Sequence, residues 1–186
     1  MLKSNKNKKI WSFIAFMSNE NLEIERKYII AMPDIENMKK MESYGQSEIL
    51  QIYLPSKNGE THRIRRRIYS DKTVYFETVK VRVDKMSSNE FEREIGKEDF
   101  DLLAKTPEPN THPIEKVRHT FIYNGQLFEI DVYPEWKNTA IMETELPTRD
   151  TLVEIPEFIR IIREVTGDKH YSNAGMSRAF PIEDHL

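Results

Sequence analysis

Residues 61–82 read THRIRRRIYSDKTVYFETVKVR, and polar and apolar side chains alternate on both sides of the pair Ser70-Asp71. Three arginines occupy alternate positions of the first half: Arg63, Arg65 and Arg67. Successive side chains of a β-strand point to opposite faces, so these arginines would share one face and isoleucines the other. The stretch therefore predicts a hairpin of two strands, joined at Ser70-Asp71, with one strongly charged face.

The same alternation recurs along the chain and predicts a mainly β protein. Eight strands are expected, at 22–31, 47–54, 61–69, 72–82, 89–97, 114–123, 126–133 and 139–146. Asn124-Gly125, between the sixth and seventh, is typical of a two-residue hairpin turn. Helices are expected at 34–44, 97–104 and 152–165, with Pro33 and Gly45 bounding the first.

Charge on the polar faces is ordered by strand. Carboxylates alternate on the first, fifth, seventh and eighth strands, and cations on the third, fourth and sixth. Like charges about 6–7 Å apart on one strand repel unless opposite charges or a charged ligand lie between them. We therefore expect an eight-stranded, closed, antiparallel barrel whose polar faces line the interior and grip polyanions and metal ions. Its apolar outer faces would be covered by the helices, and closure would leave no open sheet edge.

The composition of the chain excludes several classes of function. The chain has 186 residues and no cysteine, so it can form no disulfide, zinc–thiolate site or cysteine nucleophile. All 31 acidic residues but only 24 of the 28 basic ones follow residue 17. A net negative body of this kind is a poor general nucleic-acid binder, and no nucleic-acid partner is expected.

Residues 1–17, MLKSNKNKKIWSFIAFM, combine four lysines with a short apolar run. The run is too short to span a bilayer, and no small-residue cleavage site follows it. We expect a dispensable extension, with Met17 as an alternative start and weak membrane-surface contact as the other reading. That contact would use five residues: Lys8, Lys9, Trp11, Phe13 and Phe16. No stable membrane insertion is expected, and residues 18–186 are expected to form one domain of a cytoplasmic monomer or homodimer.

The charged motifs resemble those of the CYTH, or triphosphate tunnel metalloenzyme, superfamily. Glu23-Ile-Glu25-Arg-Lys27 is similar to its ExExK signature. The later motifs also follow the order of that superfamily: Arg63-Ile-Arg65, Thr78-Val-Lys80, Glu92-Arg-Glu94, Lys116-Val-Arg118, Glu129-Ile-Asp131 and Glu143-Thr-Glu145. The end of the chain, Glu164 to Asn173, resembles the superfamily's EVT-x-DKRYSN segment, with His170 in place of arginine. Within the superfamily, residues 125–133, GQLFEIDVY, look most like small bacterial inorganic tripolyphosphatases.

The resemblance implies an eight-stranded tunnel and hydrolysis of triphosphate compounds with Mg²⁺ or Mn²⁺. The most similar members imply inorganic tripolyphosphate as the substrate, with pyrophosphate and phosphate as products. An organic substrate is the alternative: thiamine triphosphate, a nucleoside triphosphate, or ATP cyclised as in class IV adenylate cyclases. A non-catalytic module that binds a phosphorylated ligand or nucleotide is the other alternative, although such a module would not need so many carboxylates.

The resemblance also implies roles for the charged residues. The residues expected to bind the phosphates are Lys27, Arg63, Arg65, Lys80, Lys116, Arg118 and Lys169. Those expected to hold the metal are Glu23, Glu25, Glu143 and Glu145. The candidates for a second metal, a general base or another catalytic role are Glu92, Glu94, Glu129, Asp131 and Lys27.

Four further residues have weaker assignments. Arg67 is expected in solvent because it lies near a strand end, and Asn173 is expected to cap the terminal segment. Tyr53 would either enter the tunnel beside Lys116 or pack outside it, and His119 is expected to face outward.

Overall fold

A computed structural model describes residues 22–57 and 59–183, so the predicted extension at residues 1–17 lies outside the described part. Its strands are β1 (Leu22–Ala31), β2 (Glu42–Leu54), β3 (Glu60–Ile68), β4 (Thr73–Arg82), β5 (Ser87–Ile95), β6 (Ile114–Tyr123), β7 (Gln126–Val132), β8 (Thr139–Glu145) and β9 (Ile161–Glu164). Its helices are α2 (Ile35–Met38), α3 (Lys97–Leu103), α4 (Asn173–Met176) and the short 3-10 helix η2 (Lys169–Tyr171). None of the helices in the described residues is long and apolar enough to cross a membrane.

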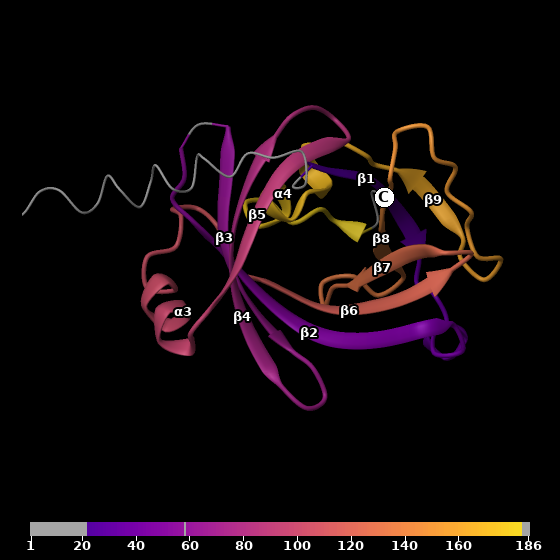
Figure 1. Ribbon diagram of the computed structural model, residues 1–186, viewed down its shortest axis with the longest axis horizontal. Helices are drawn as coiled ribbons and strands as arrows, with labels where there is room; N and C mark the ends of the chain where they lie inside the picture. The colour runs from indigo at the N-terminus through magenta and orange to yellow at the C-terminus, as the bar shows by residue number, and fades with distance from the viewer. Residues whose placement is uncertain (1–21, 58, 184–186) are drawn as a thin grey trace, which may run out of the picture.

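Eight strands form an antiparallel ring, which confirms the predicted fold (Figure 1). Their order is β5-β4-β3-β2-β6-β7-β8-β1, and β1 pairs with β5 to close the ring. Within the described residues the closing contact is short: Leu22–Ile24 of β1 lie opposite Ser87–Asn89 of β5. Beyond this contact β1 leaves β5 and pairs through Tyr28–Ile30 with β9, the ninth strand of the sheet.

The predicted turns are present. Asn124 and Gly125, between β6 and β7, have φ values of 48° and 76°. Positive φ at both central residues is the geometry of a type I′ turn, which matches the twist of the strands it joins. Between β3 and β4, the amide of Tyr69 donates to the carbonyl of Lys72 across Ser70-Asp71.

Two of the three predicted helices are wrong in extent or type. Residues 34–44 form a single helical turn, and β2 already begins at Glu42. Gly45 lies inside β2 opposite Thr120 of β6, where an added Cβ would be 2.9 Å from the Thr120 hydroxyl oxygen. Pairing with β6 therefore overrides the local helical pattern, and a register shift between Glu42 and Gly45 accommodates the change.

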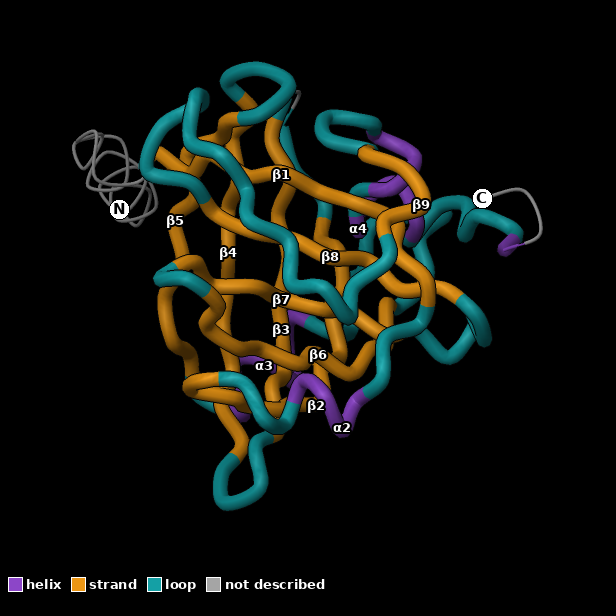
Figure 2. Tube along the Cα trace, turned by 90° about the vertical axis from the view of Figure 1, so that its right-hand side faces the viewer, coloured by secondary structure: helices purple, strands orange, loops and turns teal. Residues whose placement is uncertain are grey.

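The predicted helix at 152–165 is absent, and its last residues form β9 instead. Its apolar side chains, which suggested a helical period, pack against the outer face of the ring: Val153, Ile155, Phe158 and Ile159. Loop rather than helix therefore covers the outside of β7 and β8 (Figure 2). The third prediction is confirmed, because α3 packs Phe100 outside the ring against Tyr75.

The main hydrophobic core lies outside the ring, between the strands and these covering segments. Phe121, Phe128, Ile130 and Met142 are fully buried there. A second apolar cluster contains residues of β6, β8, α4 and the segment between β7 and β8: Ile114, Tyr133, Trp136, Ile141 and Met176. The apolar faces of most strand positions thus point outward, as predicted. Ile114 and Ile141 are exceptions, because they share the inward parity of Lys116 and Glu143 and belong to the same cluster as Met176 of α4.

Candidate active site

The ring encloses a cavity of about 690 Å³ whose lining is dominated by charged side chains. Thirteen of the residues predicted from the sequence line it: Glu23, Glu25, Lys27, Arg63, Arg65, Lys80, Glu92, Lys116, Arg118, Glu129, Glu143, Glu145 and Lys169. They come from seven strands and from η2, which lies beside α4 near the middle of the ring (Figure 1). The ring therefore brings together motifs that are spread over 147 positions of the sequence, from residue 23 to residue 169.

Two predicted catalytic residues do not line the cavity. Glu94 is exposed near the end of β5, beyond the part of that strand that faces the interior. Asp131 is fully buried and is bonded by Lys116 and Arg118. Because its oxygens already accept bonds from two cations, Asp131 positions those cations rather than contacting a ligand.

The structure also shows where three further residues with sequence-based expectations lie relative to the cavity. Arg67 lines it, which corrects the expectation that this side chain lies in solvent. Tyr53 also lines the cavity, where its hydroxyl accepts a hydrogen bond from Gln51 at 2.7 Å. His119 faces away from the cavity, as expected, and its Nδ1 is 2.9 Å from the hydroxyl of Tyr44.

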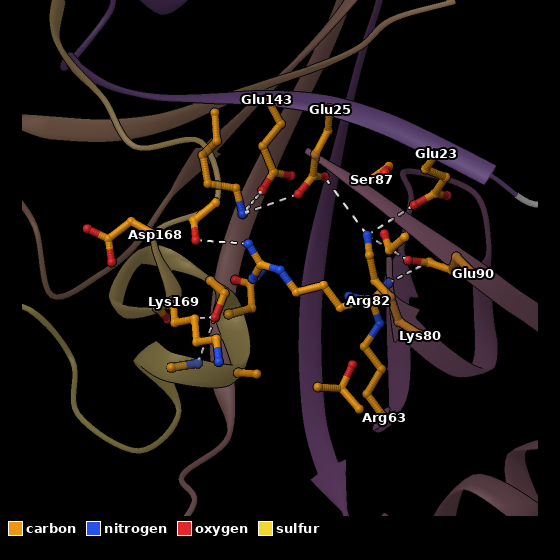
Figure 3. Close-up of a pocket in the computed structure, with 18 of the residues that line it drawn as sticks. Glu23, Glu25, Arg63, Lys80, Arg82, Ser87, Glu90, Glu143, Asp168 and Lys169 are labelled. Carbon is orange, nitrogen blue, oxygen red and sulfur yellow. Dashed lines mark hydrogen bonds and ion pairs between the residues drawn. The ribbon is translucent and has the colours of Figure 1, made fainter. Parts of the chain in front are cut away.

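Lys80 lies among the carboxylates on one side of the cavity (Figure 3). Its ammonium is 3.0 Å from Glu23, 3.9 Å from Glu25 and 3.1 Å from Glu90. Burial favours the neutral amine, but the three carboxylates outweigh it and raise the pKa of Lys80. The side chain is therefore a cation in the unliganded protein and partly neutralises this acidic group.

Glu90 is a site residue that sequence reasoning did not assign. It accepts a bond from Arg63 at 2.8 Å as well as from Lys80. Although burial opposes ionisation, Arg63 and Lys80 lower the pKa of Glu90 to about 2. The alternation on β5 carried the signal, because Glu90 shares the face of Glu92, and register places it opposite Lys80. The charged stretch of β5 in the cavity is thus Glu90 and Glu92, not Glu92 and Glu94.

Arg118 of β6 is the centre of a second group of ion pairs in the cavity, separate from the group around Lys80. Its guanidinium bonds to Asp131 at 2.7 Å, to Glu143 at 3.0 Å and also to Glu129. Glu143 in turn accepts a bond from Lys27 at 2.7 Å. Ion pairs this extensive hold the buried side chains in one arrangement, which is the preorganisation that recognition of a charged ligand requires.

Negative charge remains in excess near β1 and β8. Burial, followed by repulsion from Glu90, raises the pKa of Glu23 to about 7. Burial and repulsion from Glu129, Glu25 and Glu90 likewise raise the pKa of Glu145. Both shifts have the direction expected of carboxylates that lack enough positive charge nearby.

This acidic group is where a divalent cation would fit. Within residues 22–57 and 59–183, no three carboxylate or imidazole side chains are gathered closely enough to hold a metal ion as they stand. The ammonium of Lys80 already lies among the oxygens of Glu23, Glu25 and Glu90. A hard donor set of carboxylates with uncompensated charge nevertheless matches the chemistry of Mg²⁺ and Mn²⁺.

The segment after β9 forms part of the cavity wall. Arg82 holds its beginning, donating to the carbonyl of Gly167 at 2.9 Å, and Asn173 holds its end. The Asn173 side-chain oxygen accepts a bond from the hydroxyl of Tyr133 at 2.9 Å and lies 3.5 Å from the ammonium of Lys116. Asn173 is therefore not the cap that was expected; Ser172 caps α4 by accepting from the amide of Gly175.

Asn173→Ala should lower the free energy of unfolding by about 1–2 kcal/mol, because it leaves the buried Tyr133 hydroxyl without its acceptor. Tyr133→Phe removes the same hydrogen bond and should cost a similar amount. Urea unfolding of both variants and of the double variant measures the coupling. If the two effects simply add, the hydrogen bond does not hold the segment in place.

The comparisons with known proteins agree with this geometry. The structure is similar to that of the inorganic triphosphatase NE1496, with a TM-score of 0.55 and 28% sequence identity over 86% of this chain and 96% of that one. The chain has the CYTH fold. A second structure, of the hypothetical protein NE1496, gives a TM-score of 0.52 and 27% identity over 86% of this chain and 99% of that one.

A more distant structure has the same fold. PH1819 protein from Pyrococcus horikoshii OT3 matches this chain with a TM-score of 0.51 and 23% identity, over 69% of this chain and 80% of that one. A scan of family models found no match, and a search of curated proteins found none either. The chain is therefore similar over most of its length to a protein described as an inorganic triphosphatase.

Proposed function

We propose that this CYTH protein is a divalent-metal-dependent hydrolase that cleaves inorganic tripolyphosphate into pyrophosphate and phosphate. The observation that carries the proposal is the cavity lining, in which rows of cations face a group of carboxylates on β1 and β8. A linear triphosphate carries several negative charges, so its cleavage depends mainly on positioning and on charge neutralisation. Similarity to an inorganic triphosphatase supports the same choice.

The lining also favours an inorganic substrate over an organic one. Among the described lining residues, the apolar and aromatic side chains are Tyr53, Met86, Val165 and Ala174. A nucleobase or a thiamine ring would need an apolar or aromatic surface to stack against, whereas charged groups line most of this cavity. We therefore place thiamine triphosphate, nucleoside triphosphates and ATP cyclisation behind tripolyphosphate.

The proposed roles follow from position. Cations would bind the phosphate oxygens: Lys27, Arg63, Arg65, Lys80, Lys116, Arg118 and Lys169. Glu23, Glu25, Glu143 and Glu145 would hold Mg²⁺ or Mn²⁺, which when bound would withdraw charge from the scissile phosphoryl group. Glu143 already binds Lys27 and Arg118, so it would serve the metal less freely than the other three.

The general base is proposed among the carboxylates that reach the cavity. Glu92 accepts a hydrogen bond from the neutral Thr78 hydroxyl at 2.7 Å, and the guanidinium of Arg65 is 3.9 Å away. Glu129 is held by Arg118. Glu92 therefore has the freer carboxylate with which to orient and deprotonate a water molecule, and Lys27 would stabilise charge on the phosphate chain.

Purified protein with Mg²⁺ or Mn²⁺ should release orthophosphate from tripolyphosphate, and chelation should abolish the release. A parallel panel of thiamine triphosphate, ATP and GTP, with products resolved by chromatography, tests the organic alternatives, including cyclisation. If every triphosphate binds but survives a full metal screen, the non-catalytic binding module is the correct function and the proposal is wrong.

A further inference from the structure

The three inward arginines of β3 differ in how they are neutralised. Arg63 forms an ion pair with Glu90 at 2.8 Å. Among the described residues, the one carboxylate within ion-pairing distance of Arg65 is Glu92, at 3.9 Å. Arg67 forms no ion pair with any carboxylate in the described part of the chain. The positive charge of these arginines is therefore less and less compensated by carboxylates along the strand from Arg63 to Arg67.

Contacts nevertheless hold Arg67 in place. Its Nε donates to the hydroxyl of Ser47 at 2.8 Å, and its guanidinium lies 4.9 Å from the centre of the Tyr69 ring. Ser47 is buried, and its register partner on β6 is Arg118. The guanidinium of Arg67 is thus fixed through one nitrogen on the cavity wall, and its other nitrogens form no ion pair there.

Positive charge is in excess on this side of the cavity. Burial, and then repulsion from Arg63 and Arg118, lowers the pKa of Arg65 to about 10. Across the cavity, Glu23 and Glu145 have raised pKa values because carboxylates are in excess there. A linear polyanion that binds a divalent cation at one end would therefore place that end near β1 and β8, and its other end along β3.

We propose that Arg67, held in place by Ser47, forms a subsite for a fourth phosphate group, so that the cavity accepts tetrapolyphosphate as well as tripolyphosphate. This inference rests on the proposed function and extends its substrate class. The guanidinium row continues one position past Arg65, and at roughly 3.3 Å per residue the Cα atoms of Arg63 and Arg67 are roughly 13 Å apart. An arginine with free N–H groups on a cavity wall is well suited to binding a phosphate group through two hydrogen bonds.

The reaction on the longer chain is the same hydrolysis. The oxygen of water bonds to the terminal phosphorus near the carboxylates, and the bridging P–O bond breaks. The electron pair of that bond remains on the leaving tripolyphosphate, and the water proton that orthophosphate does not keep goes to solvent. Tetrapolyphosphate thus yields orthophosphate and tripolyphosphate, and the tripolyphosphate is itself a substrate.

Arg67→Gln tests the subsite. With Mg²⁺, kcat/KM of wild type and variant is measured on tripolyphosphate and on tetrapolyphosphate, with products separated by chain length. The variant should lose roughly tenfold or more on tetrapolyphosphate, as expected for a charged hydrogen bond, and stay within about threefold on tripolyphosphate. Arg67→Lys should restore part of the loss. Arg66→Gln is the matched control, because Arg66 lies on the same strand outside the cavity and should change neither value.

Equal losses on both substrates, or no loss on either, would overturn the subsite. Should Arg67→Gln unfold, Ser47→Ala provides the second test. It keeps the charge of Arg67 but removes the hydrogen-bond acceptor that holds it, so kcat/KM on tetrapolyphosphate should fall relative to kcat/KM on tripolyphosphate.

Calorimetric binding of both polyphosphates to full-length protein separates this inference from the proposed function. If the wild type hydrolyses neither chain, the proposed function fails. The subsite still stands if tetrapolyphosphate binds more tightly than tripolyphosphate and Arg67→Gln removes the difference, and it fails if the two bind equally.

Discussion

Glu25→Gln and Glu145→Gln should each abolish the turnover of tripolyphosphate or raise the metal concentration that turnover requires. Each change keeps the shape of the side chain and removes a negative charge from the acidic group near β1 and β8. Losing one charged ligand costs about 2–4 kcal/mol of transition-state stabilisation, or roughly 30- to 1000-fold in rate. The measurement is orthophosphate release as a function of Mg²⁺ and of Mn²⁺ concentration.

Glu115→Gln is the matched control for these variants. Glu115 lies on β6 next to Lys116 but borders a groove on the other side of the sheet, outside the main cavity. The control should stay within about threefold of wild type, as surface substitutions usually do. Unchanged metal dependence in both Glu25→Gln and Glu145→Gln would show that the cation is held elsewhere.

Arg65→Ala and Lys80→Ala should each lower kcat/KM by roughly 30- to 1000-fold while metal dependence keeps its form, because they remove contacts to the phosphates. The two variants should differ in stability. Lys80 neutralises three carboxylates, and its removal leaves Glu23, Glu25 and Glu90 to repel one another. Arg65 is a buried cation with weak compensation, so Arg65→Met, which keeps its bulk, should not lower the free energy of unfolding.

The controls for the cation variants are the arginines of opposite parity, Arg26, Arg66 and Arg93, none of which lines the cavity. Their alanine variants should remain within about threefold of wild type in activity. A slip of one residue in strand register exchanges the inward and outward sets. Inactive Arg26→Ala and Arg66→Ala beside active Arg65→Ala and Lys80→Ala would therefore refute the inward assignment.

The sequence by itself determined that eight of the nine described strands exist and which face most of their side chains occupy. Alternation has a period of two residues in any strand, so it is visible without knowing the partners. It correctly placed Glu23, Glu25 and Lys27 on the inner face of β1, and Arg63 and Arg65 on that of β3. The hairpin turn at Asn124-Gly125 was predictable for the same reason, since its chemistry is local.

Only the tertiary structure decided which inward positions reach the cavity and which ion pairs form there. Glu94 has the same parity as Glu92, yet it is exposed because the ring closes at the other end of β5, through Ser87–Asn89. The segments 34–44 and 152–165 carried helical patterns that strand pairing and packing on the ring override. Lys80 lies among three carboxylates, whereas Arg67 forms no ion pair with a carboxylate of residues 22–57 and 59–183. Long-range register sets the neighbours of each charge, and electrostatic energy depends on the distances to them.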